Sequence, residues 1–111
     1  MNATSETSAQ VFAPGAGGYD LLLCPTLGEL PPEIGVLAPD KPFEETMQLE
    51  RDHICFTPLQ NMTGDPAISL PMGVSSTGLP IGVQFAAGLG NEATLLSLAY
   101  ELEAADSFRQ L

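Results

Sequence analysis

Positive charge is the scarcest property of this chain. Of its 111 residues, three are Lys or Arg and 14 are Asp or Glu, which gives a formal net charge of −11 at pH 7. The three cations, Lys41, Arg51 and Arg109, lie far apart in the sequence. Nucleic acids and anionic membranes are bound through clustered basic side chains, so neither is an expected partner.

Long apolar runs, cysteine and histidine are also scarce. No stretch approaches the roughly 20 apolar residues of a transmembrane helix, and residues 1–10 lack the features of a secretory signal. Two cysteines, Cys24 and Cys55, are too few for a disulfide framework, so we expect a cytoplasmic protein with reduced thiols. One histidine, His53, and two separated cysteines do not have the spacing of a zinc site, so no metal ligand is predicted.

The remaining composition indicates a folded chain with short elements. The sequence is 44% hydrophobic and 15% charged, which is too apolar for a disordered acidic segment. Eleven glycines and ten prolines interrupt it often. Residues 1–18 are rich in small and polar residues and predict a flexible lead-in, which leaves residues 19–111 as the folded part.

The first half of the folded part predicts one strand, one loop and one helix. Residues 19–24 are a short apolar run closed by Pro25, which is typical of a strand. Because the run does not alternate, we expect both of its faces to be covered, as in a parallel or mixed sheet. Residues 25–42 contain five prolines and no periodicity, which predicts a long loop, and residues 43–52 have helical spacing.

The second half begins with a short helix and a hairpin. Thr57 is a candidate N-cap, Pro58 suits the first helical position, and Gly64 suits the end of the helix. Residues 66–71 and 80–86 predict two strands, and the Ser/Thr/Gly-rich segment between them predicts their turn.

The chain closes with its clearest helix, which is predicted to begin after Asn91. One face of this helix is apolar at helical spacing. It comprises Leu95, Leu98, Ala99 and Leu102, broadened by Leu96 and Tyr100, while Glu101, Glu103 and Asp106 are expected to face water.

Few side chains could perform catalysis. Ser75 and Ser76 are adjacent, and the single His53 is flanked by Asp52 and Cys55. A Ser/His/Asp triad needs these groups within hydrogen-bond reach in space, and nothing in the sequence brings them together. We expect the serines to bond locally in their turn, His53 to be a solvated or locally hydrogen-bonded helix-end residue, and Cys55 to be a small buried apolar residue.

A set of short blocks carries a family resemblance. The blocks are Tyr19–Thr26, Phe56–Leu59, Asn61–Gly64, Pro66–Pro71, Gly78–Gln84 and Asn91–Leu96. Their order and spacing resemble the C-terminal part of the amidase signature family over about residues 19–106. The resemblance implies a mixed α/β fold, in which a large central sheet is wrapped by helices. This chain would be an incomplete part of that domain, with a partial sheet and flanking helices.

The resemblance also implies what is missing. Full-length members hydrolyse carboxamides through a Ser–Ser–Lys triad, which depends on a Gly/Ser-rich signature segment and a lysine much earlier in the chain. Lys41 lies in the proline-rich loop and matches no family lysine, and Ser75 and Ser76 fall in the family's variable hairpin turn. No catalytic, cofactor-binding or metal-binding residue is therefore carried over, and no cofactor is expected.

Three hypotheses follow. In the first, the chain is the C-terminal fragment of an amidase, inactive alone. Its partner is then the N-terminal part of an amidase, or another copy through self-association, and the amide substrate binds only to the complete enzyme. In the second, the chain is a non-enzymatic acidic interaction module built on the same scaffold. In the third, it is a small hydrolase that uses Ser76 and His53.

Overall fold

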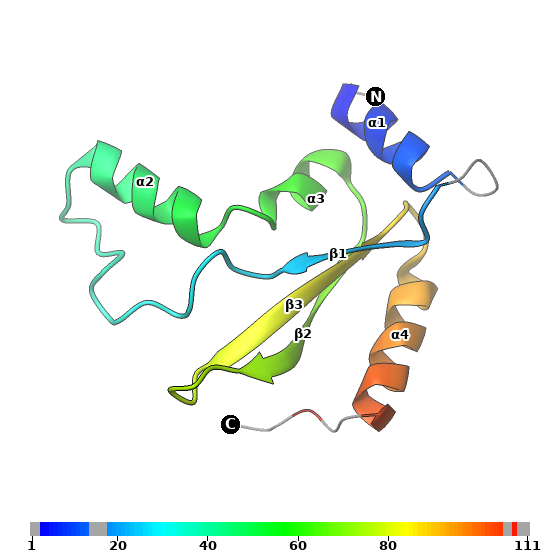
Figure 1. The fold of residues 1–111 in the computed structure, drawn as a ribbon. Helices are drawn as coiled ribbons and strands as arrows, with labels where there is room; N and C mark the ends of the chain where they lie inside the picture. The colour runs from blue at the N-terminus through cyan, green and yellow to red at the C-terminus, as the bar shows by residue number, and fades with distance from the viewer. Residues whose placement is uncertain (1–2, 14–17, 106–107, 109–111) are drawn as a thin grey trace.

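The structure, a computed structural model, describes residues 3–13, 18–105 and 108. Its elements follow one another as α1 (Ala3–Val11), β1 (Leu21–Pro25), α2 (Phe43–His53), α3 (Pro58–Thr63), β2 (Ala67–Val74), β3 (Pro80–Ala87) and α4 (Glu92–Ala105). The three strands form one sheet in the order β1-β3-β2 (Figure 1). The predicted α/β class is confirmed, as are the long loop before α2 and the β2–β3 hairpin.

The environment of β1 differs from the expected parallel or mixed sheet with both faces covered. Within the described residues the strand pairs antiparallel with β3, Leu21 opposite Ala87 and Leu23 opposite Phe85. Leu22 is 38% exposed and Leu23 is 62% exposed. The physical reason is position: β1 lies at the edge of the sheet, and α4 packs against β2 and β3.

The hydrophobic core lies between the sheet and α4. Leu70 of β2 and Phe85 and Ala87 of β3 are buried against Leu95 of α4, with Leu98, Ala99 and Leu102 packed around them. The predicted apolar face of this helix is therefore confirmed, except that Leu96 and Tyr100 do not broaden it: they are 54% and 71% exposed. Glu101 and Glu103 face solvent as expected, and Asp106 lies outside the described residues.

Prolines occur at both edges of the sheet, where they cost no ladder hydrogen bond. The Thr26 N–H donates to the Gly82 carbonyl at 3.1 Å, and the Ala87 N–H donates to the Pro66 carbonyl at 3.1 Å. Because backbone groups of an antiparallel strand alternate in direction, the nitrogens of Pro25 and Pro71 point away from β3. This explains why β2 runs through Pro71 to Val74 rather than ending at residue 71, with a register shift between Pro71 and Gly73.

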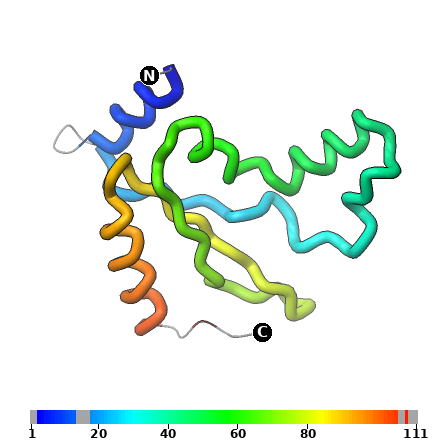
Figure 2. Tube along the Cα trace, turned by 180° about the vertical axis from the view of Figure 1, so that it is seen from behind, coloured from blue at the N-terminus to red at the C-terminus, as the bar shows by residue number. Residues whose placement is uncertain are grey.

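Helix α1 lies in the region predicted as a flexible lead-in, residues 1–18. Two of its serines bond to the end of α3 and to the segment that follows it: the Ser5 hydroxyl donates to the Thr63 carbonyl at 3.3 Å, and the Ser8 hydroxyl donates to the Asp65 carboxylate. The sequence of this helix has no apolar periodicity, which is the usual signal for a helix. Polar contacts, rather than an apolar face, hold the helix in place. Seen from behind, α1 and α3 lie at the same end of the sheet, and α2 extends to the side opposite α4 (Figure 2).

Helix α3 begins at Pro58 and ends before Gly64, as predicted. Gly64 adopts φ 83° and ψ 9°, and its N–H donates to the Gln60 carbonyl at 2.8 Å. The predicted side-chain cap is wrong: Thr57 has helical backbone angles and its side chain makes no capping hydrogen bond. A helical backbone at this position does not aim the hydroxyl at the first free N–H groups.

Gly64→Val is expected to lower the free energy of unfolding by about 1–2 kcal/mol, because a β-branched residue resists the left-handed conformation. No atom lies within 4 Å of the position that a Cβ would take, so the cost is conformational rather than steric. Urea denaturation followed by circular dichroism measures the change. Gly73→Ala is the control, because its Cβ would lie at an ordinary 3.5 Å from the Ile81 Cβ. Equal stability of wild type and Gly64→Val would contradict the prediction.

Candidate functional site

The adjacent serines lie in the turn between β2 and β3. The Ser75 Oγ accepts a hydrogen bond from the Leu79 N–H at 3.0 Å and lies 2.9 Å from the Thr77 Oγ1. The Gly78 N–H donates to the Ser75 carbonyl at 3.0 Å. Ser76 is exposed. Ser75 therefore serves the turn, as predicted.

His53 is the last residue of α2 and is 6% exposed. Its Nδ1 lies 2.8 Å from the Leu49 carbonyl oxygen, and its Nε2 lies 3.5 Å from the Glu29 carboxylate. Its own carbonyl accepts a hydrogen bond from the Gly28 N–H at 2.9 Å. The prediction of local hydrogen bonding is confirmed, while a solvated His53 is wrong, because the loop after β1 covers the ring. Its polar contacts among the described residues reach neither Ser75 nor Ser76, so no Ser–His pair is assembled.

The two cysteines are free and differ in environment. Cys55 is exposed, which corrects the expectation of a buried apolar residue: it lies in the short connection between α2 and α3. Cys24 is partly buried, and this burial raises the pKa of its thiol, against a smaller lowering by the Gln84 hydrogen bond. A raised pKa keeps the Cys24 thiol protonated at neutral pH, which makes it a poor nucleophile.

A buried polar network joins α3 to the sheet on the face opposite α4. Gln84 of β3 is 5% exposed, and its Nε2 donates to the Oε1 of Gln60 at 3.0 Å and to the Sγ of Cys24 at 3.7 Å. Buried amides need such partners, so this network fixes how α3 sits on the sheet. Sequence reasoning missed it, although a glutamine between Val83 and Phe85 in an apolar strand was the available signal.

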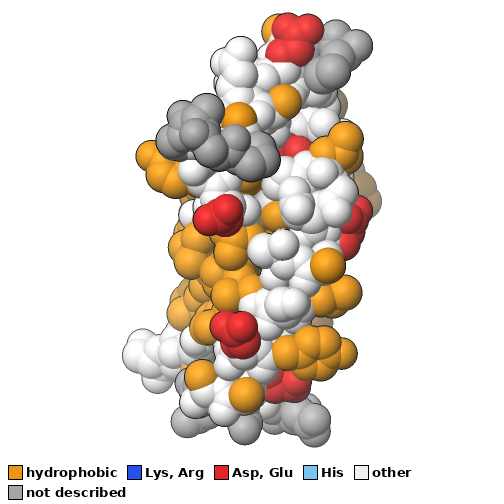
Figure 3. All heavy atoms as spheres, turned by 90° about the vertical axis from the view of Figure 1, so that its right-hand side faces the viewer, with side chains coloured by type: hydrophobic (Ala, Val, Ile, Leu, Met, Phe, Trp, Pro, Cys, Tyr) orange, Lys and Arg blue, Asp and Glu red, His pale blue; other side chains and the backbone are white. Residues whose placement is uncertain are grey.

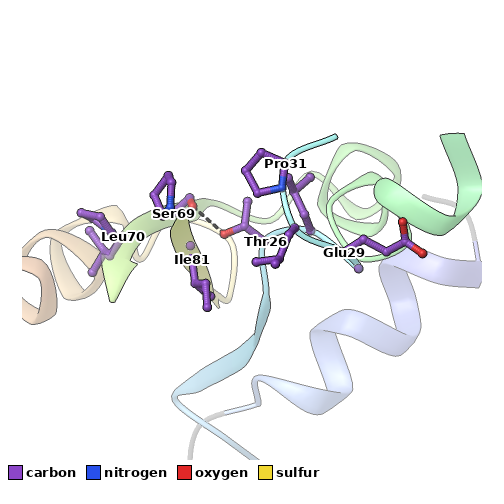
Figure 4. A pocket seen from close by; sticks show the side chains of 12 residues that line it. Thr26, Glu29, Pro31, Ser69, Leu70 and Ile81 are labelled. Carbon is purple, nitrogen blue, oxygen red and sulfur yellow. Dashed lines mark hydrogen bonds between the residues drawn. The ribbon is translucent and has the colours of Figure 1, made fainter. Parts of the chain in front are cut away.

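A pocket of about 660 Å³ opens where the loop after β1 meets the hairpin (Figure 4). Its lining comes from three segments: Thr26–Pro31, Ser69–Pro71 and Pro80–Gly82. Most of this lining is apolar, and its polar side chains are the hydroxyls of Thr26 and Ser69 and the carboxylate of Glu29. The two hydroxyls point toward one another, with 2.6 Å between their oxygens.

Gly82 makes room for this hydroxyl pair. A Cβ at Gly82 would lie 2.8 Å from the Thr26 Oγ1 and 3.1 Å from the Ser69 Oγ. The hydroxyls therefore meet across the backbone of β3, above a residue with no side chain. The pocket presents an apolar surface with one paired donor and acceptor, which suits an apolar group that carries a hydrogen-bonding function.

In the described part of the chain, no group of three His, Cys, Asp or Glu residues is placed to hold a metal ion. Nor is any of the described helices both long and apolar enough to cross a membrane.

Comparison with known proteins gives consistent matches. The sequence profile of the Amidase family matches residues 1–96. The Mycobacterium leprae protein AmiC, named as an amidase, is 49% identical over 87 residues, which cover 78% of this chain and 18% of AmiC. The 6-aminohexanoate-cyclic-dimer hydrolase of Pseudomonas sp. strain NK87 is 44% identical over 98 residues, covering 79% of this chain and 19% of the hydrolase.

A solved structure of a 6-aminohexanoate cyclic dimer hydrolase superposes with a TM-score of 0.71 at 38% identity. The match covers 92% of this chain and 22% of the hydrolase. The chain thus spans about a fifth of the length of the relatives it matches. The fold described above is a part of a larger one in these relatives.

Gly82→Ala is expected to destabilise the chain by about 1–3 kcal/mol, because its Cβ forces the Thr26 and Ser69 hydroxyls apart. Thermal unfolding by circular dichroism measures the effect. In a Thr26→Ala, Ser69→Ala background the same substitution should cost measurably less, since both crowding oxygens are gone. An equal cost in the two backgrounds would disprove this account of Gly82.

The thiols should react in two phases with a chromogenic disulfide reagent at pH 8. Exposed Cys55 reacts first, and Cys24 follows more slowly because of its burial and raised pKa. Raising the pH should reduce the difference in rate between the two phases, because a larger fraction of Cys24 is deprotonated at higher pH. Cys55→Ser should remove the fast phase; loss of the slow phase instead would reverse the assignment.

Proposed function

Because this chain belongs to the amidase family, we propose that it forms the C-terminal portion of a carboxamide hydrolase and supplies scaffold rather than catalytic groups. One observation carries the proposal: the chain spans 18–19% of the relatives it matches. The family resemblance implies that the Ser–Ser–Lys machinery belongs to the part that it does not span. Alone, the chain is inactive toward the C–N bond of amides.

The residues that could have supplied chemistry support this assignment. Ser75 bonds within its turn, His53 packs beneath Glu29, and the raised pKa of Cys24 disfavours its thiolate. The Lys41 Nζ lies 3.5 Å from the Oε1 of Glu45, four residues along the chain. This is an ordinary ion pair of partly exposed side chains. Each group therefore has a local structural explanation, and none is paired as a nucleophile with a base.

The partners follow from the same proposal. The chain associates with the remaining part of an amidase domain, and the amide substrate binds only to the complete enzyme. A cytoplasmic location fits the two free cysteines, and the net charge of −11 fits an enzyme that binds neither nucleic acid nor an anionic membrane.

The experiment compares the isolated chain with a chimera. The purified chain is expected to release no product from simple aliphatic and aromatic amides. A 6-aminohexanoate-cyclic-dimer hydrolase, in which this chain replaces the matching segment, is expected to retain turnover of its cyclic dimer. Loss of a whole triad removes nearly all rate acceleration, so residual turnover by the chain alone should not exceed background.

Two results would contradict the proposal. Turnover by the isolated chain that disappears with Ser76→Ala or His53→Ala would establish a small hydrolase instead. A folded chimera without turnover would show that this chain does not serve as the scaffold of an amidase.

A further inference from the structure

The outer edge of β1 has backbone groups without a partner in the described part of the chain. The Thr26 N–H points to β3, so by alternation those of Leu21 and Leu23 point away from it. No backbone hydrogen bond of the described residues reaches these outward groups. The next outward position is Pro25, which has no N–H. A strand that pairs with this edge can therefore accept hydrogen bonds from Leu21 and Leu23 but not from residue 25.

The side chains on the α4 side of this edge are apolar: Leu21 is partly buried against the core, and Leu23 is largely uncovered. Leu23 lies opposite Phe85, hence on the α4 side of the sheet, yet it is 62% exposed because α4 packs over β2 and β3. Seen from the side that α4 occupies, apolar side chains gather in a patch left of centre (Figure 3). We call Leu21, Leu23 and their outward backbone groups the β1 docking face. An exposed apolar edge strand of this kind is a template for pairing.

The share of the matched structure outside the match points to the kind of partner for this face. The same substructure occurs inside a 6-aminohexanoate cyclic dimer hydrolase, of which more than three quarters lies outside the match. Among the described residues the core between the sheet and α4 has four buried side chains, and so small a core is what a fragment of a larger domain would retain. Charge opposes a second copy as the occupant, since two chains together would carry twice the net charge of −11.

We propose that the β1 docking face receives a strand from the remaining part of an amidase domain, which hydrogen-bonds to Leu21 and Leu23 and covers the Leu23 side chain. This inference rests on the proposed function and specifies its partner surface. Pairing ends at Pro25, so the added strand contributes few backbone hydrogen bonds, and burial of apolar side chains supplies most of the affinity.

The test co-expresses the full chain with a tagged 6-aminohexanoate-cyclic-dimer hydrolase that lacks the matching segment. Leu23→Lys places a charge in the buried face, and Leu23→Pro removes one outward N–H. Each is expected to weaken binding at least tenfold. Ala67→Pro is the matched control, because by the same alternation it removes an outward N–H from the opposite edge, β2; its binding should stay within twofold of wild type. Circular dichroism verifies the fold of each variant.

Several results would overturn the inference: no co-purification of the wild-type chain, wild-type affinity of the Leu23→Lys chain, or an equal loss with Ala67→Pro. Chains that dimerise through β1 and exclude the hydrolase fragment would also overturn it. If Leu23→Pro does not fold, Leu23→Lys decides. Turnover is measured separately: a Leu23-dependent complex that is inactive contradicts the proposed function alone, and an active chimera insensitive to Leu23→Lys contradicts the docking face alone.

Discussion

Strand β3 is the element on which the other parts of this structure depend. It pairs with β1 on one side and β2 on the other, and successive residues serve opposite faces of the sheet. Phe85 and Ala87 meet α4, while Gln84 binds Gln60 of α3 and Gly82 lies under the Thr26–Ser69 pair. A shift of one residue in this strand would exchange the two sets, placing an amide in the apolar core.

Local signals in the sequence were sufficient for the elements that local chemistry determines. Gly64 ends α3 because its left-handed backbone is intrinsic to glycine, and Leu95 and its helical neighbours face the sheet because their spacing repeats with the helix. Contacts between segments that are distant in the sequence could not be predicted from local signals. The polar contacts of α1, the cover that Glu29 gives to His53, and the exposure of Cys55 all depend on tertiary packing.

The candidate site divides in the same way. That Ser75 bonds within a turn follows from the preference of serine for such positions, so this hydrogen bonding was predictable from the sequence. The hydroxyl pair over Gly82 was not, because Thr26 and Ser69 lie 43 residues apart and meet only through β3. Family membership adds one further fact: the segment that keeps this local fold spans about a fifth of the length of its relatives.

The hydrogen bond from the Gly28 N–H to the His53 carbonyl has a consequence for how sequences of this kind can vary. This hydrogen bond joins the start of the proline-rich loop to the end of α2, so the residues between Gly28 and His53 form a loop that is closed at its base. Ile34, which is fully exposed, and Gly35, at φ 97°, lie in this stretch. The entropy of closing a loop grows only logarithmically with its length. Insertions and deletions near Ile34 should therefore accumulate among homologues at little thermodynamic cost, while the hydrogen bond between the residues at positions 28 and 53 is kept.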